Sequence, residues 1–349
     1  MGRYTERLIA LIEPIASVRA ISASHLNMPA PFRPMFPRYR RFPSLPRHWD
    51  APLDLVHFTD VYVAPHVRRF DCARVATLHD MMPHQFRKRW PPDAFLAQAL
   101  FRRSRRALFD ADVIVVPSIA TGEALTEVAP SLKRRIRVVP VPLPDHIDVA
   151  PAVRRADGII LSVGTTAYYK NIPLMLHALA EPALSGARLV RIGERLRPAD
   201  RDLARRLGVD HRIEERGFVD EAKLLSAFQT STVLLQPSLG EGFGMPVAEA
   251  MAAGLPVVVS DGGALPEVVG NAGRVVALRS KLHTDAIDPV DSRNVAAAVA
   301  EVIESPGLRT AMSAAGLQEA ERFRLPAVRE QLFAAYAAAR EIAIARTEA

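Results

Sequence analysis

The sequence predicts an α/β protein that is built of two doubly wound domains. Short apolar runs rich in Val and Ile alternate with helical patterns along most of the 349 residues. Strands that are buried on both faces of a parallel sheet have this near-continuous apolar character. A proline-rich segment, residues 140–144, interrupts the alternation, and a second set of alternating patterns follows it. Two such sets indicate two parallel sheets with helices on both faces.

In the first set, four short runs are typical of strands. They are residues 54–58, 74–78, 112–116 and 136–139. Residues 95–109 have the apolar spacing of a helix, with arginines between the apolar positions. Residues 29–49 are dense in Pro, Arg and aromatic residues, and frequent proline excludes helix and sheet pairing there. We expect a long irregular loop, for which a membrane- or acceptor-binding role and a plain solvated connection both remain open.

The second set contains four near-continuous apolar runs that predict buried parallel strands. They are residues 159–163, 188–192, 232–236 and 256–260. Ligands of open parallel sheets bind outside the carboxyl ends of the strands. We therefore expect the functional site at these ends, in a cleft between the two domains.

The composition is that of a globular protein, with 49% hydrophobic and 24% charged residues. It excludes the disordered, collagen-like and disulfide-framed classes. Cys72 is the single cysteine, which rules out an intrachain disulfide and a thiolate metal cluster. The sequence has neither a long apolar run nor a signal-peptide pattern, so we expect a cytoplasmic protein.

The charge is divided unevenly along the chain. Residues 1–155 carry 24 Lys and Arg against 14 Asp and Glu, whereas the remaining residues carry 21 against 24. A basic half joined to a slightly acidic half indicates that the first half meets an anionic partner. A nucleic acid, a phosphorylated substrate and an anionic membrane surface all fit this charge.

Residues 236–256 hold the pattern that points most directly to chemistry. A glycine-rich loop follows an apolar strand, and Pro246 stands where it can open a helix that Gly254 closes. Loop glycines let the backbone approach a ligand, and the N–H groups of a helix start favour phosphate. Glu241 in the loop and Glu249 on the helix place two carboxylates where they can address two parts of one ligand. A plain turn with surface glutamates is the alternative.

Residues 241–249, Glu-Gly-Phe-Gly-Met-Pro-Val-Ala-Glu, resemble the E-x7-E signature of retaining glycosyltransferases of family 4, the glycosyl transferases group 1. Other segments extend the resemblance over nearly the whole chain. They are residues 162–171, 217–220 and 260–270 in the second half, and 77–80 and 115–118 in the first. The resemblance implies the GT-B architecture, in which two Rossmann-like domains face a central cleft.

The resemblance also implies how the chain is divided. Residues 1–148 would form the N-terminal acceptor-side domain, and residues 149–325 the nucleotide-sugar donor-binding domain. A C-terminal helix over residues 326–349 would cross back to the first domain. The strand and glycine-rich loop that open the family's N-terminal domain are missing from the sequence. We therefore expect this domain to be incomplete at its start and less stable than an upstream-extended form.

Residue roles follow from the same resemblance. His79 and Glu241 would be catalytic, with His79 hydrogen-bonding the sugar and Glu241 holding the sugar and diphosphate. Lys170 would contact the donor diphosphate, and Glu249 the ribose hydroxyls. The other donor-binding residues would be Gly164, Thr165, Arg216, Phe218, Val219, Gly242, Phe243, Gly244 and Met245. Tyr169 stands where the family commonly has an arginine, so one diphosphate contact is either lost or supplied by another arginine.

The family retains the anomeric configuration, and we expect a front-face route in which the leaving phosphate takes the acceptor proton. Lys170 and backbone N–H groups would meet the charge that develops on this phosphate. A carboxylate nucleophile is the alternative route, with Glu241 as the one candidate. We expect no metal and no cofactor besides the nucleotide sugar. Asp110 and Asp112 have the spacing of a metal-binding D-x-D motif, but they lie between a helix end and a strand start, away from the donor motifs.

The expected function is the retaining transfer of a sugar from a UDP- or GDP-linked donor to a glycan or lipid-linked acceptor. It would be of the hexosyltransferase type, similar to mannosyltransferases, and serve cell-surface polysaccharide or glycolipid biosynthesis. Peripheral contact of the basic half with the inner membrane face is expected, and no nucleic acid partner. Three alternative functions remain open. They are a non-catalytic sugar-nucleotide-binding protein, a GT-B epimerase or phosphorylase, and a nucleic-acid-binding protein, for which the net charge of +7 is weak support.

Overall fold

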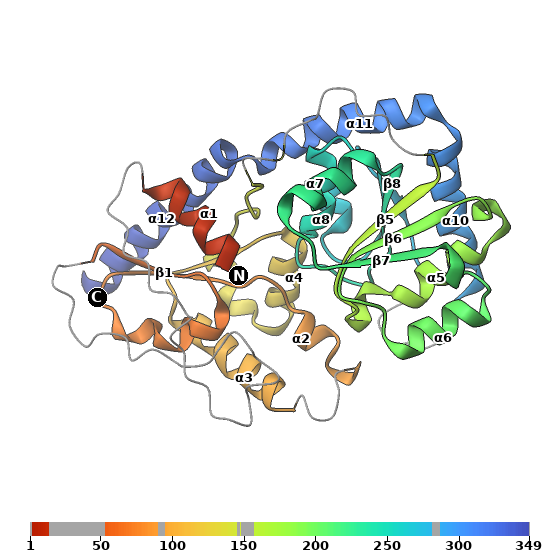
Figure 1. Cartoon of the computed structure of the whole chain (residues 1–349). Coiled ribbons are helices and arrows are strands. Elements are labelled where there is room, and N and C mark those ends of the chain that lie inside the picture. The colour runs from red at the N-terminus through yellow and green to blue at the C-terminus, as the bar shows by residue number, and fades with distance from the viewer. Residues whose placement is uncertain are drawn as a thin grey trace. The chain divides into compact units, whose positions relative to one another are not determined.

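The computed structural model describes residues 2–13, 53–89, 95–144, 147, 157–280 and 287–348. The chain divides into two compact units (Figure 1). The first comprises Met1–Val116, Leu125–Pro142 and Arg329–Ala349, and the second comprises Pro117–Ala124 and Leu143–Val328. The loop predicted over residues 29–49 lies outside the described residues.

The sheet of the first unit contains four parallel strands, which follow one another across the sheet in chain order. They are β1 (Leu55–Phe58), β2 (Ala73–Thr77), β3 (Val113–Val116) and β4 (Ile136–Val138). All four predicted strands of this half are confirmed, with ends that differ by one residue at most. Every residue of β3 is buried, as expected for an interior strand of a parallel sheet.

The helices of the first unit include two that run on into the second. They are α1 (Gly2–Ile12), α2 (Met82–Gln85), α3 (Phe95–Arg106), α4 (Ile119–Val128), α12 (Leu325–Glu348), and the 3-10 segments η3 (Val61–Arg69), η4 (Arg87–Arg89), η6 (Ala107–Asp110) and η7 (Pro130–Arg135). The helix predicted over 95–109 ends as an α-helix at Arg106, and the chain then tightens into η6. Such 3-10 turns are frequent at helix ends.

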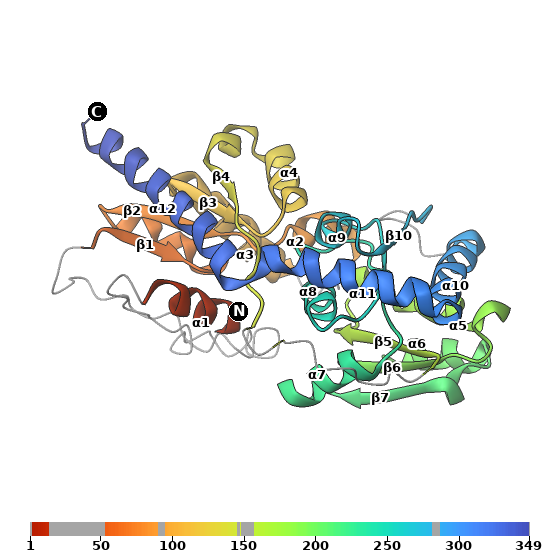
Figure 2. The same ribbon diagram turned by 90° about the horizontal axis from the view of Figure 1, so that it is seen from above.

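One face of α12 is buried in the first unit. Leu332, Ala335 and Ala339 recur every three or four residues and are fully buried. Figures 1 and 2 both show α12 beside β1. The hydroxyl of Tyr336 lies 2.8 Å from Nδ1 of His57 on β1. The chain end is thus fixed to the sheet by an apolar stripe and a polar contact.

The sheet of the second unit has six parallel strands in the order β10-β9-β8-β5-β6-β7. They are β5 (Ile159–Gly164), β6 (Arg188–Gly193), β7 (Ile213–Gly217), β8 (Val233–Gln236), β9 (Val257–Ser260) and β10 (Arg274–Val276). From β5 the chain adds strands outward on one side, then returns to β8 and adds strands on the other. This is the Rossmann strand order, and its direction reverses between β5 and β8.

Two strands of this sheet were not predicted from the sequence. β7 reads Ile-Glu-Glu-Arg-Gly and β10 reads Arg-Val-Val, and both lie at the edges of the sheet. Their residues are half-buried or exposed, so neither strand has the continuous apolar run of a strand covered on both faces. The four predicted strands are β5, β6, β8 and β9, the interior of the sheet.

The helices of the second unit cover both faces of its sheet. They are α5 (Ile172–Ala180), α6 (Pro198–Arg206), α7 (Glu221–Thr230), α8 (Met245–Ala252), α9 (Leu265–Val269), α10 (Pro289–Glu304) and α11 (Pro306–Ala320), with the 3-10 segments η8 (Tyr168–Lys170), η9 (Pro182–Leu184), η10 (Asp210–Arg212) and η11 (Glu321–Phe323). In the described part of the chain, no helix is long and apolar enough to cross a membrane.

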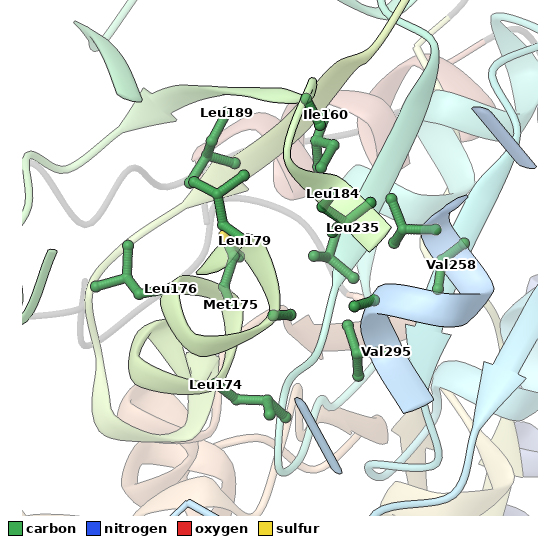
Figure 3. Packing of buried hydrophobic residues seen from close by; sticks show 14 of the residues in the cluster. Ile160, Leu174, Met175, Leu176, Leu179, Leu184, Leu189, Leu235, Val258 and Val295 are labelled. Carbon is green, nitrogen blue, oxygen red and sulfur yellow. The ribbon is translucent and has the colours of Figure 1, made fainter. Parts of the chain in front are cut away.

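A large apolar cluster joins α5 and α10 to the strands of the second unit (Figure 3). Leu174, Met175 and Leu179 of α5 pack in one cluster with Val295 of α10 and Leu235 of β8. Each is at most 2% exposed. Burial of one such side chain contributes about 1.5–3 kcal/mol, so this cluster stabilises the packing of α5 and α10 on the sheet.

Candidate active site

The loops after β5 and β8 meet where the strand order of the second sheet reverses. Lys170 ends η8, which follows β5, and Glu241 lies in the loop that follows β8. The two side chains form an ion pair, with Nζ 2.7 Å from Oε1, and are only 13% and 9% exposed. Ligands of doubly wound sheets bind at this point. The fold therefore brings together two of the predicted site residues, 71 positions apart in the sequence.

Glu241 is anchored through its side chain and its backbone. In addition to the ion pair, Gln236 donates from Nε2 at 2.8 Å and Ser238 from Oγ at 2.7 Å, both to the same oxygen, Oε1. The N–H of Ala264 donates to the Glu241 carbonyl at 3.0 Å. A Cβ on Gly263 would stand 2.4 Å from that carbonyl oxygen, so glycine is required where the two segments touch.

The glycine-rich loop leads into α8, as predicted. Gly244 is the residue before the helix and has φ of +100°, and Pro246 stands in the first turn. The N–H groups of Gly242 to Met245 donate to no backbone carbonyl of the described residues. Such N–H groups at a helix start are suited to bind an anion. Glu249 lies on the same helix and is half-buried.

Two buried hydroxyls fix the orientation of this loop. Ser118 Oγ donates to the Gly242 carbonyl at 2.7 Å, and Thr121 Oγ1 donates to it at 3.0 Å. Both hydroxyls belong to the 117–124 segment of the second unit. The peptide bond that follows Gly242 is trans, so the N–H of Phe243 points away from these hydroxyls. The Phe243 ring packs edge-on against Phe323, with ring centroids 5.2 Å apart.

The turn after β5 borders the ion pair. Gly164 ends the strand with φ of +137°, and a Cβ on it would lie 3.8 Å from Lys170 Nζ. Thr165 follows and is exposed. The N–H of Leu239 donates to the Tyr169 carbonyl at 2.7 Å, which joins the loop after β5 to the loop after β8. The predicted residues of the two loops thus form one connected group.

Three predicted donor-binding residues lie apart from this group. Arg216 lies near the carboxyl end of the edge strand β7, and Phe218 and Val219 follow this strand. β6 separates β7 from β5, which at the usual strand spacing puts β7 about 10 Å away. Arg216 pairs with Glu214 at 2.7 Å, and Phe218 is 81% exposed. The fold therefore places these three residues away from the Lys170–Glu241 pair.

His79 belongs to the first unit and follows β2. Its Nε2 lies 2.8 Å from the Thr59 carbonyl, which can only accept, so Nε2 carries the ring proton and Nδ1 is an acceptor. The ring of Tyr4 lies edge-on to it, at 4.6 Å. Burial lowers the pKa of His79, which keeps the imidazole neutral at pH 7. Asp80 accepts from the N–H of Met82 at the start of α2.

A polar network near His79 was not predicted from the sequence. His57 on β1 contacts Tyr336 of α12 through Nδ1 and Thr77 of β2 through Nε2, both at 2.8 Å. Tyr4 of α1 reaches the same threonine hydroxyl at 3.4 Å. The network joins four elements of the first unit. Thr77 lies in a segment that resembles the family, but no sequence pattern marks its partners.

The two aspartates with D-x-D spacing have structural partners. Asp110 pairs with Arg68 at 2.6 Å. Asp112 accepts from the N–H of Arg74 at 2.9 Å and lies 3.4 Å from Arg346 of α12. Asp110 thus joins η3 to η6, and Asp112 joins β2 and α12 to the start of β3. Within the described residues, no group of three or more His, Cys, Asp or Glu side chains is arranged to hold a metal ion.

Comparisons with known proteins agree with this geometry. The family model of the glycosyl transferases group 1 matches residues 147–319, and that of Glycosyltransferase Family 4 matches residues 10–144. An uncharacterised glycosyltransferase of Methanocaldococcus jannaschii is 37% identical over 104 residues. That alignment covers 29% of this chain and spans 27% of the relative.

Solved structures share the fold at low sequence identity. Sucrose-phosphate synthase from Thermosynechococcus elongatus has a TM-score of 0.66 at 20% identity, covering 87% of this chain and 75% of its own. HepE from Anabaena, solved in complex with UDP-glucose, has a TM-score of 0.63 at 17% identity, covering 80% and 77%. The fold is that of the GT-B glycosyltransferases. The chain belongs to the glycosyl transferases group 1.

Proposed function

We propose that the protein is a retaining glycosyltransferase, which moves a sugar from a nucleotide-diphosphate sugar to a hydroxyl of a glycan or lipid-linked acceptor. The Lys170–Glu241 ion pair at the reversal of strand order carries this proposal. The ammonium group of Lys170 and the N–H groups that precede α8 face the same site, so both can bind one diphosphate. A UDP-linked donor is favoured because HepE, which shares the fold, is solved with UDP-glucose; a GDP-linked donor is the alternative.

In the proposed reaction, the bond between the sugar's anomeric carbon and the β-phosphate oxygen breaks. A bond to the acceptor oxygen forms on the same face of the sugar, and the acceptor's proton passes to the leaving phosphate. Lys170 and the N–H groups of Gly242 to Met245 stabilise the negative charge that develops on the phosphate. In measured cases one such donor contributes about 3–4 kcal/mol. This route needs neither a protein base nor a metal ion.

Glu241 serves in this proposal as an anchor and not as a nucleophile. Its Oε1 accepts hydrogen bonds from Lys170, Gln236 and Ser238. Such hydrogen bonds stabilise the negative charge of the carboxylate. A carboxylate so engaged is a weaker nucleophile. Its role is to orient Lys170 and to bind hydroxyls of the transferred sugar.

His79 binds the sugar as a neutral group in the same proposal. With Nε2–H committed to the Thr59 carbonyl, the lone pair on Nδ1 can accept from a sugar hydroxyl. Glu249 accepts from the ribose hydroxyls of the nucleotide.

The test is a thermal-shift screen of UDP, GDP and their sugar conjugates on the wild type and three variants. A ligand at 100 times its Kd stabilises by about 2.7 kcal/mol, a shift that the screen resolves. Lys170→Ala and Glu249→Ala should lose the shift for the nucleotide that binds. Lys223→Ala is the matched control, because Lys223 is an exposed lysine of the same unit, paired with Asp220.

The outcomes separate the functions that remain. A shift for one nucleoside diphosphate that both site variants lose and the control keeps supports the donor site. Release of the nucleoside diphosphate from the matching sugar conjugate, with sugar incorporated into an acceptor glycan or lipid, then establishes transfer. Binding without transfer or donor hydrolysis would identify a non-catalytic sugar-nucleotide-binding protein. A folded wild type that binds no nucleotide would contradict the proposal.

We also propose that the first unit contacts an anionic membrane, where a lipid-linked acceptor of cell-surface glycan or glycolipid synthesis would lie. Arg102, Arg103 and Arg106 of α3 are exposed, and Arg68 and Arg69 of η3 are exposed as well. Basic groups of this kind are attracted to the anionic lipids of the cytoplasmic leaflet. The excess of basic residues in the first half supports the same contact.

A further inference from the structure

A buried arginine of the second unit has no part in the site described so far. Arg191 lies on β6 and is 2% exposed. Its Nη1 donates to Ser162 Oγ at 3.0 Å, and its Nη2 donates to the carbonyls of Gly164 and Glu194, both at 3.2 Å. A longer contact reaches the Thr165 carbonyl at 3.4 Å. All of these acceptors are uncharged.

The positive charge of Arg191 is not closely balanced. Glu215, its partner across the β6–β7 ladder, is bound instead to Arg201 at 3.0 Å and to the N–H of Leu196 at 2.7 Å. Burial lowers the pKa of the Arg191 guanidinium, and the carboxylates of Glu215, Asp200 and Glu194 oppose this in part. Its Nε is buried without a hydrogen-bond partner in the described part of the chain. A buried cation without a close counterion is unfavourable, which points to an anion that the site receives.

Arg191 and Lys170 contact the same turn. Arg191 binds the Gly164 carbonyl, and Lys170 Nζ lies 3.8 Å from the place where a Cβ on Gly164 would stand. The charge of Lys170 is matched by Glu241 at 2.7 Å, so this pair adds no net charge. Tyr169, the residue before the lysine, is uncharged. Glu194 places a carboxylate at the same turn, where its Oε2 accepts from the N–H of Thr166 at 2.8 Å. Arg191 is thus a cation beside the turn whose guanidinium binds uncharged acceptors alone within the described residues.

We propose that Arg191 is a positioning residue for the diphosphate of the donor. It holds the Gly164–Thr165 turn by its carbonyl oxygens, and its charge is balanced when the diphosphate binds above the turn. Arg191 acts through the turn and does not touch the donor. The inference rests on the proposed function. It gives a role in that function to an arginine that interrupts the apolar run of a predicted strand, residues 188–192.

The test compares Arg191→Met with Arg212→Met. Arg212 is the matched control, because its guanidinium also binds main-chain carbonyls, those of Leu179 and Leu184, but at the start of β7 and away from the carboxyl ends of the strands. Kd values for UDP and GDP are measured by calorimetry, and those for uridine and guanosine by saturation-transfer NMR. Arg191→Met should weaken binding of the nucleoside diphosphate at least tenfold and change nucleoside binding less than twofold. Arg212→Met should leave both within twofold.

Two further variants keep the test decisive. Arg191→Lys, which retains the charge, should bind the diphosphate at least threefold better than Arg191→Met. If Arg191→Met does not fold, Arg191→Gln, whose amide still donates to a carbonyl, carries the same expectation. An equal loss for nucleoside and diphosphate, or an equal loss in the Arg212 variant, would show that Arg191 has a structural role alone. A wild type that binds neither UDP nor GDP would overturn the proposed function instead.

Discussion

His57 joins β1 to β2 and α12 as a neutral group. Burial and, to a smaller extent, the nearby His79 lower its pKa from 6.5 to about 3. Both ring nitrogens are engaged, with the hydroxyls of Tyr336 and Thr77. A neutral imidazole donates from one nitrogen and accepts at the other, so one hydroxyl accepts and the other donates. Protonation would place a charge among packed side chains, and the folded state therefore resists it.

We expect this histidine to make the free energy of unfolding fall as the pH is lowered from about 6.5 towards 3. In that range the unfolded chain binds a proton at His57 that the folded chain does not bind. One such proton changes the free energy of unfolding by up to about 1.4 kcal/mol per pH unit. Above pH 6.5 the side chain is neutral in both states and adds no pH dependence. Urea unfolding at a series of pH values measures the slope.

The variant His57→Gln isolates this contribution from that of the carboxylates, which titrate over part of the same range. Its amide can still bond to the hydroxyls but does not titrate, so its stability should fall less steeply below pH 6.5. His211→Gln, at an exposed position of η10, is the control and should keep the wild-type slope. Equal slopes for the wild type and His57→Gln would show that the fold does not hold His57 neutral.

At the residue scale, the resemblance named Lys170 and Glu241 as site residues, but neither their ion pair nor the histidine network was predicted. Glu241 lies in a local signature, and Lys170 follows a strand that the apolar pattern predicts, so the resemblance identifies both before any fold is known. His57 and Tyr336 are 279 positions apart, and neither belongs to a recognised pattern. Only the packing of α12 on the first sheet makes them partners.

At the scale of elements, β5 and β6 approach each other closely at their carboxyl ends. Gly193 has φ of +117°, and a Cβ built there would lie 2.4 Å from the carbonyl oxygen of Gly164. The N–H of Glu194 donates to that same carbonyl at 3.0 Å. Both the φ angle and the available space therefore require glycine, and they fix the turn that borders Lys170.

We expect Gly193→Ala to destabilise the protein by at least about 2 kcal/mol, because backbone strain of about 1–3 kcal/mol is added to the displacement of Gly164. Affinity for a nucleoside diphosphate should fall with it, since the displaced turn borders the ion pair. Gly186→Ala is the control, with nothing within 4 Å of its Cβ and an ordinary φ, and should stay within about 0.5 kcal/mol of the wild type. Denaturant unfolding measures both. Similar stabilities of the two variants would contradict the close approach.

In the six-stranded sheet, prediction from the sequence succeeded for the interior strands and failed at the edges. β5, β6, β8 and β9 lie between two neighbouring strands, and their apolar runs reflect cover on both faces. β7 and β10 lie at edges, where Glu and Arg side chains interrupt the pattern. The break of the 95–109 helix into α3 and η6 was not predicted either, because apolar spacing does not distinguish a last α-helical turn from a 3-10 turn.

At the scale of the whole molecule, the alternation of apolar runs and helical patterns predicted the α/β class, which the two parallel sheets confirm. The order of the strands within each sheet could not be predicted from this alternation, because it depends on how the helices connect one strand to the next. The reversal between β5 and β8 is known only from the fold. It is this reversal that brings together two loops far apart in the sequence and so places Lys170 beside Glu241.

The uneven charge of the chain leads to a test of membrane contact. We expect the protein to co-sediment with vesicles of phosphatidylcholine and 30–40% anionic lipid at low salt, and to be released as salt shortens the Debye length from about 10 Å at 0.1 M. Changing Arg102, Arg103 and Arg106 of α3 to Gln should weaken binding at least tenfold, at about 1 kcal/mol per charge near the surface. The same change at three exposed arginines of the second unit, Arg195, Arg205 and Arg206, should have less than a threefold effect. Equal binding to neutral and anionic vesicles would show that charge does not drive the association. Equal losses in the two triple variants would show that net charge, and not the first unit, governs it.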